Sequence, residues 1–193
     1  MDGLVKRIEK AQPFFRKVAT NQYLRAIRDG FIALMPIIIF SSFFLLIANV
    51  PQIWGFVWPK KVATALNLFY NLSMGFLSLM AASTVAKALT GSLNLKLPKT
   101  NQIPVAGVQY TAQISFAFVA IDTLLNKGNL YLATDMIGTK GLICAFLVAF
   151  IVPNIYYFCF KHNVTITLPD VVPQNIAQAF KNIIPVSYTH LTL

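Results

Sequence analysis

The sequence has 193 residues, of which 56% are hydrophobic and only 11% are charged, and its mean hydropathy is +0.64. An ordinary globular domain carries roughly 25% charged residues, so this composition excludes a soluble domain, which needs charges to cover its surface. The net charge of +10 would indicate nucleic-acid binding in a soluble chain. Here the charges lie between long uncharged runs, which excludes a soluble nucleic-acid-binding protein as well.

Residues 1–29 predict a cytoplasmic amphipathic leader. Apolar residues recur there at i, i+4, i+7 and i+11 with basic residues on the other faces, a pattern typical of a helix lying in the membrane interface. These residues are Leu4, Ile8, Ala11 and Phe15. Pro13 is expected to break this helix, and a second helix is expected to run through Tyr23, Leu24 and Ile27 into the membrane. The basic residues either bind anionic lipid headgroups or serve only as a topology signal.

Four charge-free runs follow, over residues 30–59, 62–86, 100–121 and 141–160. The shortest has 20 residues and, at about 1.5 Å per residue, spans the roughly 30 Å hydrocarbon layer as a helix. We therefore predict an all-α membrane protein in which residues 30–160 form a four-span domain. The transmembrane helices are placed at residues 31–50, 66–86, 104–124 and 142–160.

Lysine and arginine residues predict the orientation of these spans. One side carries the seven basic residues of the leader together with Lys87, Lys96, Lys99, Lys161 and Lys181. The other side carries Lys60, Lys61, Lys127 and Lys140. Because positive residues accumulate on the cytoplasmic side, both termini are predicted to be cytoplasmic.

Residues 161–185 predict a cytoplasmic linker and a second amphipathic helix. Residues 164–168 alternate like a short strand or extended linker, and Pro173 suits the first turn of a helix. A single apolar stripe follows, which predicts a helix lying flat on the cytoplasmic surface. The stripe consists of Val172, Ile176, Phe180 and Ile183.

Small residues recur at spacing four in three spans, which predicts close helix packing and no particular function. They are Ser78, Ala82, Ala86, Gly107, Thr111, Ser115, Gly141, Ala145 and Ala149. Polar side chains in the spans either hydrogen-bond between helices or line a substrate path. They are Asn67, Asn71, Gln109, Gln113 and Asn154. Asp29 either forms a functional pair with Arg28 or a local ion pair with Arg25 one turn away.

No phosphate-binding loop, metal motif or nucleophile motif is present in the sequence. We therefore predict no catalytic, substrate-binding, cofactor-binding or metal-binding residue in this chain, and no cofactor. We interpret Cys144 and Cys159 as small buried hydrophobic residues. His162, beside Lys161, is expected to contact headgroups.

The segment NQYLRAIRDGFIALMPIIIFSSFFLLIANV at residues 21–50 resembles the start of the sugar-translocating Enzyme IIC subunits of the bacterial phosphotransferase system. The lactose, cellobiose and diacetylchitobiose group is the most similar, through its AIRDGF-like start and the MP pair in the first span. Residues 138–141 and the segment KHNVTITLPDVVPQNIAQAFKNIIP at 161–185 also resemble this group. Val171 and Gln174 depart from its pattern, where Gly and Pro are usual.

The resemblance implies the N-terminal part of a permease in the bacterial plasma membrane. Such a permease translocates a disaccharide such as cellobiose, chitobiose or lactose, and a cytoplasmic IIB subunit, supplied through IIA, phosphorylates the sugar. Family members are about twice this length, and their second half contacts the sugar. The implied partners of the present chain are therefore membrane lipids, a second copy in a homodimer, and the IIB and IIA subunits, with sugar bound only in the full-length protein.

Residues 186–193, VSYTHLTL, depart from the apolar continuation that the resemblance implies. We predict that they are a non-native tail on a truncated gene product, with a genuine polar ending as the alternative. The alternative to a permease fragment is a non-transporting membrane scaffold, in which the small-residue stripes drive dimerisation. A small pore is the weakest reading, because no span carries a polar stripe.

Overall fold

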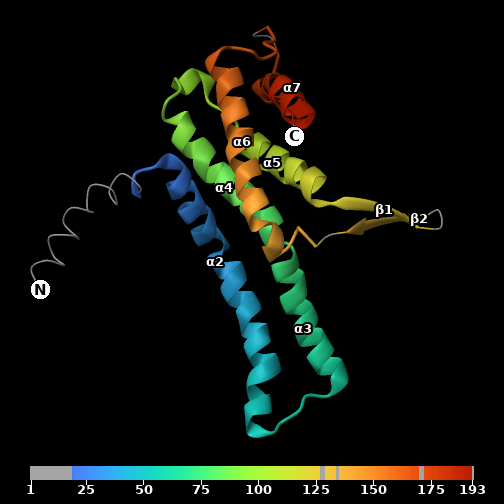
Figure 1. The fold of residues 1–193 in the computed structure, drawn as a ribbon. Coiled ribbons are helices and arrows are strands. Elements are labelled where there is room, and N and C mark those ends of the chain that lie inside the picture. Colours follow the sequence, from blue (N-terminus) through green and yellow to red (C-terminus); the bar gives the residue numbers. More distant parts are fainter. Residues whose placement is uncertain (1–18, 127–128, 134, 170–171, 193) are drawn as a thin grey trace, which may run out of the picture.

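The computed structural model describes residues 19–126, 129–133, 135–169 and 172–192. The described chain is almost entirely helical (Figure 1). Its elements are α2 (Gln22–Asn49), η1 (Val50–Trp54), α3 (Lys60–Gly75), α4 (Leu77–Asn94), η2 (Lys99–Asn101), α5 (Val105–Ala120), β1 (Asp122–Asn126), β2 (Asn129–Ala133), η3 (Thr139–Gly141), α6 (Leu142–Lys161) and α7 (Gln174–Thr192).

Four helical segments in the described residues are long and apolar enough to cross a membrane. They are Gln22–Trp54, Lys60–Asn94, Lys99–Ala120 and Thr139–Lys161. The predicted number of spans and the predicted helical class are confirmed. The expected second helix through Tyr23 is also confirmed, because α2 begins at Gln22 behind an Asn21 cap whose side chain accepts a hydrogen bond from the Tyr23 N–H. The predicted leader helix lies outside the described residues.

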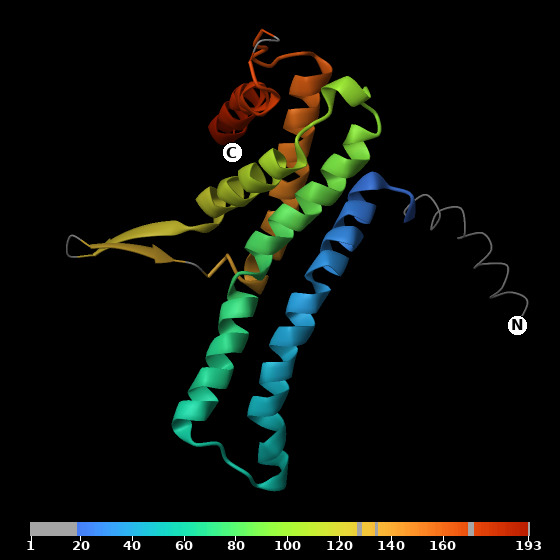
Figure 2. The same ribbon diagram turned by 180° about the vertical axis from the view of Figure 1, so that it is seen from behind.

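Helix α4 is the centre of the bundle, with α2, α5 and α6 packed around it (Figures 1 and 2). The predicted small-residue stripes make these contacts. Eight of the nine stripe residues are buried, Gly107 being half-buried. Small side chains allow the helix backbones to approach closely, so the packing role predicted for the stripes is confirmed.

Helices α2 and α3 form a hairpin that extends away from the rest of the bundle (Figure 1). The Phe44 and Phe69 rings stack at 5.0 Å, and the Trp58 indole N–H donates to the Ile47 carbonyl over 2.9 Å. The connecting turn passes through Gly55 in the left-handed region, at φ 77°. No residue of α3 is buried among the described neighbours, so this hairpin presents its outer surface to lipid or protein.

The second span differs from the continuous helix predicted at residues 66–86. It is longer and is interrupted at Phe76, between α3 and α4. The segment before α6 fills the interruption, because the Ser78 N–H donates to the Ile137 carbonyl over 3.0 Å and the Ser78 hydroxyl donates to the Gly138 carbonyl over 2.5 Å. Non-helical backbone at membrane depth is tolerated where protein covers it. Lys87, just beyond the predicted span at residues 66–86, lies inside α4.

The third span is shorter than predicted. Helix α5 ends at Ala120, and residues 122–124, predicted as helix, belong instead to a two-stranded antiparallel hairpin. Asp122 pairs with Ala133, and Asn126 pairs with Asn129. The hairpin projects sideways from the bundle (Figure 1). It satisfies the backbone of this connection without a helix.

The segment after α6 forms neither helix nor strand over residues 164–168, which supports the linker interpretation. Helix α7 then begins at Gln174 and continues through Pro185 to Thr192. The predicted amphipathic helix is therefore confirmed and is longer than expected. Its predicted position flat on the cytoplasmic surface stays a prediction, as does the non-native origin of residues 186–193.

Candidate functional site

A groove of about 520 Å³ lies between the start of α2, the outer face of α6 and the end of α7. Aromatic rings from all three helices line it, including Tyr23, Phe150 and Tyr188. Its polar centre is the Asn154 side chain, whose oxygen accepts a hydrogen bond from the Tyr23 hydroxyl over 3.3 Å. The Asn154 amide also donates to the Phe150 carbonyl over 2.7 Å. Because its polar atoms already bond to protein, the groove is mainly an apolar surface.

A second hollow of about 550 Å³ lies at the interruption between α3 and α4. Its lining includes the exposed polar residues Asn71, Asp135, Thr139 and Lys140. Gly138 fits closely here, because a Cβ added to it would lie 3.4 Å from the Met74 carbonyl oxygen. The hollow is thus open, is lined by both polar and apolar residues, and sits beside the backbone break.

The polar residues that we singled out in the spans form hydrogen bonds of two kinds. Some join two helices, and others stay within one helix. The Gln109 amide of α5 donates to the Ser83 hydroxyl of α4 over 3.3 Å, and Asn154 bonds to Tyr23 of α2 as described above. Both are contacts between helices. Asn67 donates to the Ala63 carbonyl of its own helix over 2.9 Å. Gln109 and Asn154 therefore hold helices together and Asn67 bonds locally, which favours the hydrogen-bonding interpretation for these three side chains.

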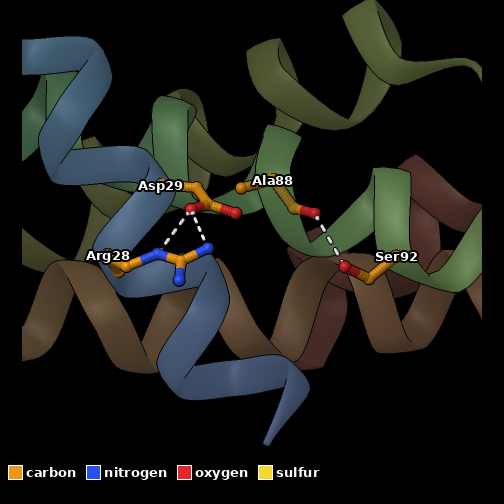
Figure 3. A network of polar contacts seen from close by, with 4 residues as sticks. All are labelled: Arg28, Asp29, Ala88 and Ser92. Carbon is orange, nitrogen blue, oxygen red and sulfur yellow. Dashed lines mark hydrogen bonds and ion pairs between the residues drawn. The ribbon is translucent and has the colours of Figure 1, made fainter. Parts of the chain in front are cut away.

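Asp29 forms an ion pair with Arg28, over 2.7 Å (Figure 3). The two side chains are 45% and 61% exposed, respectively. The alternative that we considered, a local ion pair between Asp29 and Arg25, is wrong, because Asp29 pairs with Arg28. Gly30, the residue after Asp29, packs on Val85 of α4, so the charged pair lies near the contact of α2 with α4.

Two residues that the sequence analysis did not single out, Tyr156 and His190, bond to residues of the predicted small-residue stripe on α5. Thr111 of α5 and Tyr156 of α6 share a buried hydrogen bond of 2.8 Å. Ser115 of α5 meets the His190 ring of α7 at 3.4 Å. A tyrosine in an apolar span was the available signal, since a buried phenol hydroxyl normally needs a partner.

Helix α7 turns polar residues toward the bundle and leaves its apolar stripe outward. Thr189 is fully buried, and one polar atom each of Gln178 and Asn182 is buried without a hydrogen-bond partner in the described structure. Ile176, Phe180 and Ile183 are exposed. The described residues therefore leave the stripe uncovered.

Cysteine and histidine residues show no arrangement for chemistry. Cys159 is buried and Cys144 is half-buried, and both are free thiols. The His162 ring lies against the Phe158 ring, 4.7 Å between centroids. Within the described ranges, no group of three or more His, Cys, Asp or Glu side chains could hold a metal ion.

The family model described as "Phosphotransferase system, EIIC" matches residues 28–193. The chain belongs to the EIIC family. It is 54% identical over 180 residues to the "PTS system lactose-specific EIICB component" of Lacticaseibacillus casei, covering 93% of this chain and 30% of that protein. It is 48% identical over 193 residues to the component of the same name in Streptococcus mutans, covering 100% of this chain and 34% of that protein. The chain thus spans about a third of the length of these relatives.

The fold is also similar to that of a solved EIIC structure. The crystal structure of the transporter ChbC, the IIC component from the N,N'-diacetylchitobiose-specific phosphotransferase system, matches with a TM-score of 0.76. The identity is 22%, and the match covers 95% of this chain and 45% of ChbC. This likeness shows a shared EIIC fold for the helices described above.

Proposed function

We propose that this chain is the N-terminal membrane-spanning part of a sugar-specific EIIC permease, and that the sugar is lactose. The observation that carries this proposal is the 54% identity to a component named lactose-specific. Several further relatives at 48–49% identity bear the same name. The sequence alone led to cellobiose, chitobiose or lactose, and the names of these relatives favour lactose over cellobiose.

The chain's part in this activity is that of a scaffold. Its helices pack around α4 through small residues, and its polar side chains bond mainly between helices or within one helix. The proposal therefore places the sugar-contacting residues elsewhere in the complete permease. We still predict no catalytic, substrate-binding, cofactor-binding or metal-binding residue among these 193 residues.

We propose that both termini are cytoplasmic and that the membrane is the bacterial plasma membrane. The relatives are named EIICB components, which favours a B part on the same polypeptide over the separate IIB subunit implied by the sequence resemblance. The B part, supplied with phosphate through IIA, would phosphorylate lactose that reaches the cytoplasmic side. The charged product cannot recross the hydrocarbon, so phosphorylation traps it.

Uptake of radiolabelled lactose tests the function. Cells that express the complete reading frame containing this chain should accumulate lactose phosphate only when phosphoenolpyruvate and the B part are functional. Unlabelled lactose should compete better than unlabelled cellobiose. Accumulation of free lactose without the B part would contradict the permease proposal, and stronger competition by cellobiose would contradict the choice of sugar.

A non-transporting dimerisation module remains the second candidate, favoured by the exposed apolar surface of the α2–α3 hairpin. Phe40, Phe43 and Leu46 of α2 are each more than half exposed. The small-residue stripes cannot drive such a dimer, because they are used inside the chain. A Phe43→Cys variant should then form crosslinked dimers. Saturable lactose binding by these 193 residues would contradict both the dimerisation module and the scaffold role.

A further inference from the structure

The apolar groove beside α6 has the depth of one leaflet of the membrane. Its lining residues on α6 follow one face of the helix from Phe150 to Phe158. Phe150 lies 11 residues before Lys161, where α6 ends, so the groove reaches about 16 Å from that end at about 1.5 Å per residue. One leaflet is half of the roughly 30 Å hydrocarbon layer. The groove therefore runs from one turn below Lys161 to about the middle of the membrane.

Two helices flank α6 at this groove, α2 on one side and α7 on the other (Figures 1 and 2). Helix α2 begins at the level of Asn154, because the Tyr23 hydroxyl donates to the Asn154 side chain. It therefore walls only the deeper part of the groove. Six of the seven lining residues belong to α2 and α6, and Tyr188 alone belongs to α7. Most of the groove is thus independent of the origin of residues 186–193.

The size of the groove suits a flexible hydrocarbon chain better than a further helix. Ile151 and Phe158 in its lining are 41% and 58% exposed, so apolar surface is open to an occupant. From Phe150 to Phe158 the groove is about 12 Å long, and a helix about 10 Å wide would fill about 900 Å³ over that length. The groove has a volume of about 520 Å³. A helix could lie over it but not inside it.

Helix α7 starts at the same end of the bundle as α5. Gly107 of α5 lies beside Asn182 of α7, since a Cβ added to Gly107 would be 3.1 Å from the Asn182 Nδ2 atom. Eight residues further along each helix, Ser115 meets His190. The two helices therefore run in the same direction.

That shared end is the Lys161 end of α6. The Asn101 side chain, shortly before α5, donates to the Phe160 carbonyl over 2.9 Å. Lys181 lies seven residues before Tyr188, which is two turns of helix. It is therefore on the same face of α7 as the groove residue Tyr188 and nearer to the Lys161 end.

Basic side chains thus flank the mouth of the groove. Lys161 and His162 are exposed on α6, and the His162 ring lies against the groove residue Phe158, 4.7 Å between centroids. Lys181 stands on the α7 side. Neither α6 nor α7 contains an Asp or Glu residue, so neither helix carries a carboxylate that would repel an anion.

We propose that the groove binds one anionic phospholipid. Its hydrocarbon chains lie along α6 from Phe158 to Phe150, and its phosphate lies at Lys161 and Lys181. In the orientation proposed above, this lipid belongs to the cytoplasmic leaflet, where basic pockets between transmembrane helices bind anionic headgroups. The inference requires that the chain spans a membrane, but it does not depend on which sugar the permease carries.

Native mass spectrometry of the purified full-length protein in detergent tests the headgroup contact. Phosphatidylglycerol and phosphatidylcholine are titrated separately, and the affinity for the first bound lipid is measured. A lysine near anionic lipid contributes about 1 kcal/mol, or about fivefold in affinity. The two lysines should therefore favour phosphatidylglycerol about 25-fold.

Charge variants at the two ends of α6 locate this preference. Lys161→Gln should reduce it to about fivefold, because one of the two lysines remains. Lys140→Gln, just before the opposite end of α6, is the matched control and should leave it at about 25-fold. Equal affinities of the unaltered protein for the two lipids, or equal losses in the two variants, would overturn the site.

Filling the groove tests the chain contact. Ile151→Trp places a larger side chain in the lining and should abolish the tight first binding of phosphatidylglycerol. Leu147→Trp is the matched control one turn away, since Leu147 is 57% exposed and lies outside the lining, and it should bind as the unaltered protein does. Unchanged binding by Ile151→Trp would overturn the groove as the site.

A photoreactive lipid gives a readout that needs no variant. Phosphatidylglycerol with a diazirine in one acyl chain should crosslink to Ile151, Ile155 or Phe158, as located by mass spectrometry of peptides. Crosslinks only elsewhere, as expected if the remainder of the permease covers the groove, would overturn the proposal. None of these measurements uses lactose, so failure of the lipid site and failure of the permease proposal are separate results.

Discussion

Thr111 shows how a polar side chain is satisfied inside the bundle. Its hydroxyl lies 2.8 Å from the Gly107 carbonyl and 2.8 Å from the Tyr156 hydroxyl. The carbonyl can only accept, so Thr111 donates to Gly107 and accepts from Tyr156. Tyr156 is fully buried. Its hydroxyl therefore depends on Thr111 as acceptor.

The two residues should respond unequally to mutation. Tyr156→Phe removes one interhelical hydrogen bond and should cost about 0.6 kcal/mol of unfolding free energy, the typical value within membranes. Thr111→Val leaves the Tyr156 hydroxyl buried without a partner and should cost about 1–3 kcal/mol. Unfolding titrations in detergent measure both.

The double variant is the control for this pair. Replacing both partners by apolar groups of similar shape removes the unsatisfied hydroxyl, so Thr111→Val with Tyr156→Phe should be more stable than Thr111→Val alone. Equal losses for the two single variants would contradict the assigned direction of the hydrogen bond.

Sequence reasoning found some of these residues and missed others for a physical reason. The spacing of Gly107, Thr111 and Ser115 indicates one face of a helix and hence packing. It does not reveal which helix lies opposite, so Tyr156 and Ser83 could not be named as partners. The pairing of Asp29 with Arg28 depended in the same way on side-chain conformation, which helix periodicity does not specify.

At the scale of elements, the contact of α2 with α4 depends on Gly30. A Cβ added to Gly30 would lie 2.5 Å from the Val85 Cγ2 atom and 3.0 Å from the Val85 Cα atom. The second distance involves backbone, which a side-chain rotation cannot move. Any larger residue must push the two helices apart.

Gly30→Ala should therefore destabilise the bundle, by about 1–3 kcal/mol as for other overpacked cores. Thermal unfolding in detergent measures this change. Gly91→Ala is the matched control on α4, since its Cβ would meet no atom within 4 Å, and alanine in a helix should stabilise by about 0.5–1 kcal/mol relative to glycine. A Gly30→Ala variant as stable as Gly91→Ala would contradict the close approach of α2 and α4.

Hydropathy predicted the elements that cross the membrane but not their interruptions. Charge-free length identifies a span because hydrocarbon excludes charges. The break at Phe76 depends on the Ile137 and Gly138 carbonyls, which arrive from a segment about 60 residues later. The β-hairpin was missed because its apolar residues continue the hydropathy of α5, although the sequence holds Asn126 and Gly128, residue types typical of turns, which could have indicated it.

For the whole molecule, the decisive property is which end of the bundle faces the cytoplasm. The α4–α5 loop and the end of α6 lie at one end, with Lys96, Lys99 and Lys161, whereas the Lys60 and Lys61 turn lies at the other (Figure 1). The positive-inside rule therefore predicts a cytoplasmic α4–α5 loop even without Lys87.

Reporter fusions check this orientation. Green fluorescent protein fused after Asn101 should fluoresce, and alkaline phosphatase fused after Asn126 should be active, because the β-hairpin is expected on the outer side. The exchanged pair, phosphatase after Asn101 and fluorescent protein after Asn126, serves as the control and should give no signal. The reverse pattern would contradict the predicted topology.

The central position of α4 also bears on biosynthesis. Helix α4 must leave the ribosome with only α2 and α3 available, although α5 and α6 complete its surroundings. Between Asn94 and Lys161 the ribosome adds 67 residues, which takes about 3–13 s at about 5–20 residues per second. During that interval the buried serine and threonine side chains of α4 have no neighbours from those later helices, so the insertion machinery must shelter this segment until translation delivers them.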